Sequence, residues 1–366
     1  MARRRVLLAL LLALCAGVLV SAAAVTAKTG AKAAPFKAAW IYVGPHNDAG
    51  WSQAHDEGRL YVQKMLGSKV QTTFKENVPE GPQTCQVIDS LVRDGNKIIF
   101  LTSFGFQPCA VSESKKYPDV KFEMATGDAQ GPNLADYFGA AEDSVYLSGM
   151  AAGAATKDGT IGYVVAFPIP EVLRHASAFA LGAQATHPGV KVKLVWTHSW
   201  YAPDKEKQAA ESLISAGADV LGQNVDSPST GQVAGSKGAS WVGYDSDARK
   251  FAPKAWLTAA VYNWGPYYLS RVKAAMDGSW KSGFYYGSLK DGFTLLAPYG
   301  NGVSAKTKQL IAQQKALIES GKWNEFTGPL YDQSGKLRVK KGQRLTVKQL
   351  YAINWLVKGV VGSAKG

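Results

Sequence analysis

Polar and aromatic residues follow a hydrophobic run near the start of the chain. The segment from Val43 to Trp51 comes after the strand-like residues 38–43 and before a helix-like stretch. Asp48 can cap that helix and accept hydrogen bonds, and Trp51 offers a flat apolar face. Ligands of open α/β sheets bind at the carboxyl ends of strands, so this loop suits a small planar molecule with polar edges. The alternative is that Asp48 only caps the helix and Trp51 only packs.

The same residue types recur at the ends of other strand-like runs. Several such loops at one edge of a two-lobed protein predict a cleft with stacking faces and polar rims. The alternative for each aromatic residue is packing within a lobe, and we expect at least half of them to do this. The candidate ligand-binding residues are Asp48, Trp51, Ser103, Phe104, Asp128, Trp200, Asn224, Asp226, Asp245 and Trp264.

Residues arranged for catalysis are harder to find. The five histidines show no metal-ligand spacing, and there is no Gly-x-Ser-x-Gly elbow, phosphate loop or dinucleotide fingerprint. Asp245 and Asp247 could form a carboxylate pair, but this spacing is common on loops. We therefore expect a binding protein with no catalytic residues, metal or cofactor, and we keep an enzyme as the alternative.

The N-terminus has the pattern of a signal peptide. Three arginines precede an apolar core at residues 6–20, and small residues at 21–27 offer cleavage sites, which predicts a signal peptide at residues 1–27 and export to the periplasm or another extracytoplasmic space. A lipid anchor at Cys15 is the less favoured alternative, because Leu14 stands where a small residue is usual. In an oxidising compartment the remaining cysteines, Cys85 and Cys109, are expected to form a disulfide.

The rest of the chain alternates β-rich and amphipathic runs. This order predicts an α/β protein with parallel sheets and helices on both faces, and its length suits two lobes. The formal net charge is +13. A basic cluster near the end is interpreted as a solvated face, with an acidic partner surface as the alternative. We expect a monomer that binds no nucleic acid.

Several motifs together resemble the basic membrane protein family of ABC-transporter substrate-binding proteins, over residues 38–362. They are Asp48-Ala49-Gly50-Trp51, Thr102-Ser103-Phe104-Gly105-Phe106, Ala125-Thr126-Gly127, Ile161-Gly162-Tyr163-Val164, Gly217-Ala218-Asp219-Val220 and Gly243-Tyr244-Asp245-Ser246-Asp247.

The resemblance implies a type I periplasmic-binding-protein fold, with two doubly wound parallel-sheet lobes joined by a hinge. By this pattern the first lobe takes residues 36–155 and about 262–292, and the second takes 156–261 and about 293–366. The stretch 326–355 resembles an extension found in part of the family.

The family binds purine nucleosides or purine bases. The resemblance implies that Asp48 contacts the ligand, that Trp200 stacks on the purine and that Asp245 hydrogen-bonds it, with Trp51 as a second stacking face. The chain departs from the nucleoside binders at Asn224 to Pro228 and at Tyr262 to Trp264. Because Trp264 and an extra acid would shrink the space for a ribose, we expect a free base such as adenine. A nucleoside is the alternative ligand.

The resemblance also implies a membrane permease as the partner of the closed, ligand-bound form. The alternative is a sensor that presents the closed form to a membrane receptor.

Overall fold

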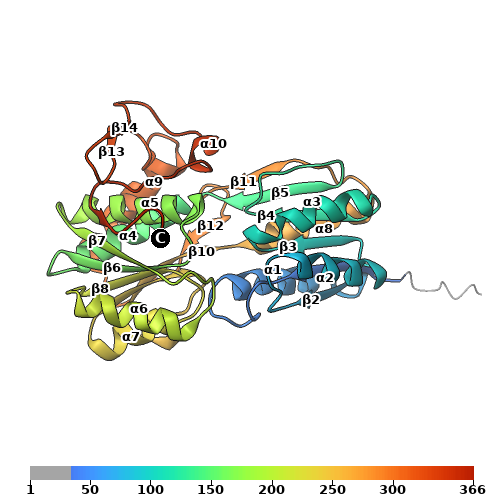
Figure 1. Cartoon of the computed structure of the whole chain (residues 1–366), viewed down its shortest axis with the longest axis horizontal. Coiled ribbons are helices and arrows are strands. Elements are labelled where there is room, and N and C mark those ends of the chain that lie inside the picture. The colour runs from blue at the N-terminus through green and yellow to red at the C-terminus, as the bar shows by residue number, and fades with distance from the viewer. Residues whose placement is uncertain (1–33) are drawn as a thin grey trace, which may run out of the picture. The chain divides into compact units, whose positions relative to one another are not determined.

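The computed structural model describes residues 34–366 (Figure 1). The expected signal peptide at residues 1–27 and the alternative anchor at Cys15 lie outside the described residues. Within residues 34–366, no helix is both long and apolar enough to cross a membrane.

The first sheet has six parallel strands in the order β11-β5-β4-β3-β1-β2. Its central strands are short hydrophobic runs because helices cover both faces of the sheet. The strands are β1 (Phe36–Ile41), β2 (Val70–Lys75), β3 (Ile98–Leu101), β4 (Lys121–Ala125), β5 (Leu134–Gly139) and β11 (Phe284–Gly287).

The second sheet has seven strands in the order β12-β10-β9-β8-β6-β7-β15. All neighbours are parallel except β12, which is antiparallel to β10. The strands are β6 (Thr160–Val165), β7 (Lys191–Trp196), β8 (Val220–Asn224), β9 (Ser240–Asp245), β10 (Trp256–Tyr262), β12 (Thr294–Leu296) and β15 (Val360–Val361).

Helices cover both faces of each sheet. On the first sheet, α2 (Pro82–Arg93) and α3 (Gln107–Lys116) share an apolar cluster with one face, while α1 (Trp51–Leu66) and α8 (Trp264–Asp277) pack on the other. On the second sheet, α6 (Pro203–Ser215) and α7 (Ser229–Lys237) cover one face, and α4 (Ala141–Ala155) and α5 (Pro170–Thr186) cover the other. The predicted α/β class with parallel sheets is confirmed.

Three connections join the sheets. The chain passes from β5 to α4, from β10 to α8, and from β11 to β12. Because α4 packs against α5, β10 and α9 (Ala305–Glu319), it belongs with the second sheet. We therefore propose that the first crossing lies near residue 140 rather than at the expected limit of residue 155.

The C-terminal segment, residues 327–366, lies against the second sheet. Its strand β15 pairs with β7, and its hairpin consists of β13 (Leu330–Tyr331) and β14 (Leu337–Val339). The short helix α10 (Val347–Leu350) begins with a capping box, in which the Thr346 hydroxyl accepts from the Gln349 N–H. Tyr351 follows this helix, and its ring lies 5.7 Å from Phe284 and 6.1 Å from Tyr286, both on β11 of the first sheet.

Candidate ligand-binding site

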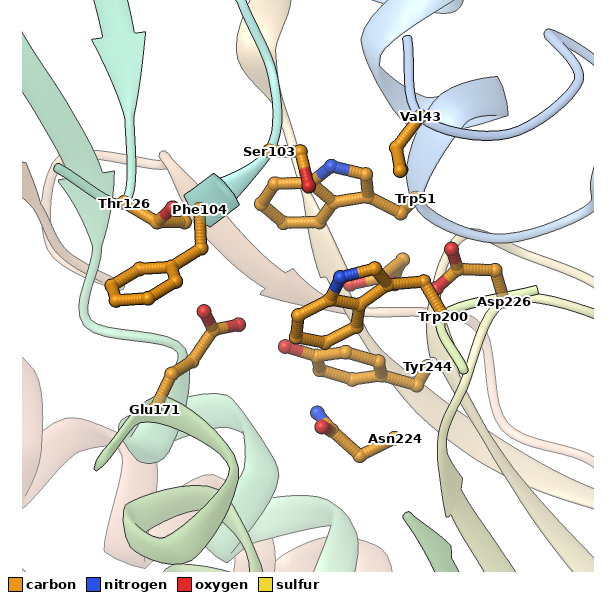
Figure 2. Close-up of a pocket in the computed structure, with 11 residues that line it drawn as sticks. Val43, Trp51, Ser103, Phe104, Thr126, Glu171, Trp200, Asn224, Asp226 and Tyr244 are labelled. Atoms are coloured by element: carbon orange, nitrogen blue, oxygen red, sulfur yellow. The ribbon is translucent and has the colours of Figure 1, made fainter. Parts of the chain in front are cut away.

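A cavity lies at the carboxyl ends of the strands of both sheets. The loops of the first sheet contribute apolar and hydroxyl groups, and those of the second contribute most of the acids (Figure 2). This is where ligands bind in parallel α/β folds, because strand ends converge there. The walls are formed by Val43, Trp51, Ser103, Phe104 and Thr126 on one side and by Glu171, Trp200, Asn224, Asp226, Tyr244 and Asp245 on the other.

Two tryptophans come from different sheets to the same cavity. Trp51, the first residue of α1, donates its indole N–H to the Thr102 carbonyl oxygen, which fixes the ring. Trp200, in the loop after β7, is half-buried and has a buried indole N–H without a partner. Trp51 packs edge-on against His55, Tyr262 and Trp264, which leaves its cavity face for a ligand.

Two acids of the cavity have buried oxygens without hydrogen-bond partners. Both carboxylate oxygens of Asp245 and Oδ2 of Asp226 are buried and unpartnered. Burial raises the pKa of each carboxyl well above its ordinary value, and neighbouring acids, including Asp48, raise it further. Burial likewise raises the pKa of Glu171 to about 7. A ligand that supplies N–H or O–H donors would form the most stabilising hydrogen bonds with such a site.

Behind the cavity, a neutral histidine orients Asn224 and Tyr244. His175 Nδ1 lies 3.0 Å from the Tyr244 hydroxyl and 3.4 Å from the Asn224 amide nitrogen. Burial, and then the neighbouring Arg174, lowers the His175 pKa well below its ordinary value. Nδ1 of the neutral ring can therefore accept a hydrogen bond, and the Tyr244 hydroxyl is the nearer of the two donors. This leaves the buried Asn224 Oδ1, which has no partner, free to accept from a ligand.

Two residues of the cavity wall adopt a backbone conformation that L-residues rarely adopt. Asp245 has φ 66° and Thr126 has φ 63°. Such conformations persist only where surrounding structure holds them, and they are common at binding sites. The Thr126 hydroxyl is also buried and without a partner.

Asp48 does not line this cavity. Its Oδ1 accepts the backbone N–H groups of Gly50 and Gln53, and its Oδ2 accepts that of Ser52. Burial raises its pKa to about 6, although these backbone bonds oppose the shift. In this structure Asp48 therefore holds the loop at the start of α1, and its contact with the ligand stays a prediction.

Trp264 and Asp128 also lie away from the cavity wall. Trp264 is buried behind Trp51, stacked on Tyr262 at 4.5 Å, so it does not narrow the ligand space as expected. Asp128 is exposed and accepts from Gln107 at 2.8 Å. Ser103 does line the cavity, but its hydroxyl donates to Glu80 at 2.6 Å.

Four wall residues are additions to the sequence-based set: Val43, Thr126, Glu171 and Tyr244. Thr126 and Tyr244 belong to strand-end motifs that the sequence singled out. Glu171 gives no such signal, because it lies in the first turn of α5 and only the packing of that helix brings it to the cavity.

Away from the cavity, Cys85 on α2 and Cys109 on α3 form a disulfide with a Cα–Cα distance of 5.0 Å. In residues 34–366, no group of three or more histidine, cysteine or acidic side chains is placed to hold a metal ion.

Comparison with known proteins identifies the family. Residues 36–326 match the Bmp family, described as ABC transporter substrate-binding protein PnrA-like. The chain belongs to this family. It is 42% identical over 324 residues to a purine-binding protein of Brucella abortus, covering 88% of this chain and 92% of that protein. The predicted membership and the expectation of a solute-binding protein rather than an enzyme are confirmed.

Two further comparisons extend this result. A putative ABC transporter glucose-binding protein of Haloferax volcanii is 32% identical over 295 residues, covering 81% of this chain and 75% of that protein. An ABC transporter solute-binding protein of Aeropyrum pernix has a similar structure, with a TM-score of 0.69 and 17% identity over 79% of this chain and 92% of that chain. The last match concerns the fold alone and confirms the periplasmic-binding-protein fold. Proteins of this class act on the extracytoplasmic side of the membrane.

Proposed function

We propose that this protein captures a free purine base, adenine or a close relative, for an ABC importer. The observation that carries the proposal is the cavity between Trp51 and Trp200, whose buried carboxylates and amide oxygen lack partners. The purine-binding relative from Brucella abortus supports the same ligand class.

The tryptophans would hold the flat faces of the base. By analogy with nucleic-acid sites, stacking on an aromatic side chain contributes about 1 to 3 kcal/mol per base. Trp51 is fixed by its bond to Thr102, so less conformational entropy is lost when the ligand stacks on it.

The edges of the base would meet Asp226, Asp245 and Asn224. Their free oxygens accept hydrogen bonds, so the ring and exocyclic N–H groups of an aminopurine are suitable donors. A ligand without these donors would leave buried carboxylates unpaired, which disfavours it strongly.

Capture would occur by closure of the two lobes. Each lobe supplies one tryptophan, so a bound base gains both contacts only when the lobes meet. We propose that the closed form delivers its ligand to a membrane permease and that the N-terminal residues 1–27 direct the protein out of the cytoplasm.

Calorimetric titration of refolded, ligand-free protein tests the proposal. Adenine and related bases are expected to bind more tightly than adenosine and inosine, because the extra acid Asp226 lines the cavity and restricts the space for a ribose. Binding of nucleosides without bases would favour the nucleoside alternative. Because one relative is described as a putative glucose-binding protein, glucose belongs in the panel, and a response to glucose alone would contradict the purine assignment.

A further inference from the structure

A second chamber adjoins the ligand cavity. It shares three wall residues with the cavity, namely Phe104, Thr126 and Glu171. Figure 2 shows Phe104 and Glu171 on the side of the cavity away from Asp226. A ligand group that passes between these two side chains would leave the base cavity and enter the chamber.

The walls of the chamber are mainly apolar. Phe138 of the first sheet and Ile169 and Pro170 at the start of α5 line the chamber, and Phe104 lines both the chamber and the ligand cavity. An alkyl or aryl group would be removed from water there, which stabilises the complex by the hydrophobic effect.

Unsatisfied donors lie in the same wall. Arg174 is only 1% exposed, and its Nε lies 3.4 Å from Glu142 Oε2. The guanidinium lies over the rings of Phe138 and Tyr351, at 5.2 and 5.1 Å, while its Nη2 is buried without a partner. The Tyr351 hydroxyl is also buried and unpartnered. Because a guanidinium can only donate, the missing partner is an acceptor oxygen.

We infer that the chamber is a subsite for a substituent on the bound base, with a short apolar body and a terminal neutral oxygen such as a hydroxyl. A neutral group is favoured over phosphate or carboxylate because Asp128 and Glu171 also line the chamber. The inference rests on the proposed function. Tyr351 lies beyond residues 36–326, so this wall is contributed by the C-terminal segment outside the family match.

Titrations with substituted adenines test the inference. The probes carry a pentyl or a hydroxybutyl group, either on the exocyclic amine or on the imidazole nitrogen, and adenine is the reference. At one of the two positions, the pentyl and the hydroxybutyl probe are both expected to bind with an affinity within about tenfold of that of adenine. The hydroxybutyl compound should bind about fivefold more tightly than its pentyl isostere, because only it can accept a hydrogen bond from Arg174 or Tyr351.

Two variants distinguish binding in the chamber from binding in the base cavity. Ile169→Trp places a ring in the chamber, and it should weaken the substituted adenines by more than about tenfold while adenine itself binds as before. Tyr351→Phe keeps the ring and removes the hydroxyl, so it should reduce the hydroxybutyl preference and leave pentyl binding unchanged. The second variant is conservative and provides a test even if Ile169→Trp fails to fold.

The outcomes are distinguishable. If adenine binds but no substituted adenine binds at either position, the subsite is wrong and the proposed function stands. If Ile169→Trp weakens adenine and its derivatives equally, the chamber holds no substituent. If no purine binds the wild-type protein, the proposed function fails and the inference fails with it.

Discussion

Gly50 of the first lobe lies directly against the Asp226 backbone of the second. A Cβ atom at Gly50 would overlap the Asp226 carbonyl oxygen and come within 2.7 Å of the Asp226 Cα. Beside this contact, the Ser246 hydroxyl donates to the Ala49 carbonyl oxygen. The loops after β1, β8 and β9 therefore meet in this structure, and a glycine is required for the approach.

Gly50→Ala should prevent full closure, because the added methyl group meets backbone rather than a movable side chain. We expect ligand affinity to fall by more than about tenfold, since the two tryptophans could not reach the base together. Gly283→Ala is the matched control, because a Cβ at that position meets no atom within 4 Å. Equal affinity of the two variants would show that this contact does not limit closure.

Trp200→Ala should remove one stacking face. The expected loss is about 1 to 3 kcal/mol of binding free energy, or roughly 5- to 150-fold in affinity, measured by calorimetry. Trp355→Ala removes a tryptophan of the C-terminal segment that does not line the cavity, and it should bind ligand normally. Trp200→Phe should recover part of the loss, because it restores an aromatic face.

Ligand binding should release protons. The carboxyls of Asp226 and Asp245 have raised pKa values, and that of Glu171 is raised to about 7. Hydrogen bonds from a ligand to the ionised forms would lower these values, so affinity should rise from about pH 5 to about pH 8. Calorimetry in buffers of different ionisation enthalpy measures the protons released. Proton uptake on binding would contradict the proposed hydrogen bonds from the ligand to ionised carboxylates. Asp245→Asn should reduce the release.

The same acids should make the ligand-free protein less stable at higher pH. Their pKa values are raised in the folded state, so the folded protein holds protons more tightly than the unfolded chain does. Stability is therefore greatest below the ordinary carboxyl pKa and is lost as the pH rises through the folded values, near 7 for Glu171. Urea unfolding at several pH values should show this decline, and saturating ligand should reduce it.

Asp48→Asn should lower the free energy of unfolding. Its effect on ligand affinity should be smaller. An amide presents one acceptor oxygen, whereas the carboxylate accepts from Gly50, Ser52 and Gln53. The loss of one or two of these buried bonds should cost about 1 to 3 kcal/mol in the free energy of urea unfolding. If unfolding is unchanged and only ligand affinity falls, Asp48 contacts the ligand as the family resemblance implies.

Replacement of both Cys85 and Cys109 by alanine should reduce stability without affecting binding. The disulfide joins α2 to α3 across a sequence separation of 24, and removal of such a cross-link costs about 3 kcal/mol in the chain-entropy model. Neither cysteine lines the cavity, so ligand affinity should be unchanged. A large loss of affinity would mean that the cross-link also positions Phe104.

Strand-end residues were the part of the site that the sequence could indicate. Trp51, Trp200 and Asp245 reach the cavity because parallel strands bring their carboxyl ends to one edge, and hydrophobic runs identify those ends. Trp264 follows a strand in the same way, but its ring turns into the aromatic cluster behind Trp51. The direction of a side chain after a strand depends on register and packing, which a sequence pattern does not contain.

The secondary-structure elements also differ in how clearly the sequence indicates them. The hydrophobic runs of β3 and β6 are visible in the sequence. The residues of β2 and α7 are mixed in character, so these two elements give no clear sequence signal and depend on tertiary packing. The C-terminal return to the second sheet depends on the two-residue strand β15, which is too short to give a periodic signal.

The aromatic cluster behind the cavity should make the intrinsic tryptophan fluorescence of the protein sensitive to ligand. Trp51 lies 5.4 Å from Trp264 and 5.6 Å from Tyr262, at the point where β10 passes into α8 and the chain crosses between the sheets. Trp51 lies at this crossing and is proposed to stack on the ligand, so its fluorescence should change when the site is filled. Ligand arrival and lobe closure could then be followed in real time by stopped-flow emission without any attached dye.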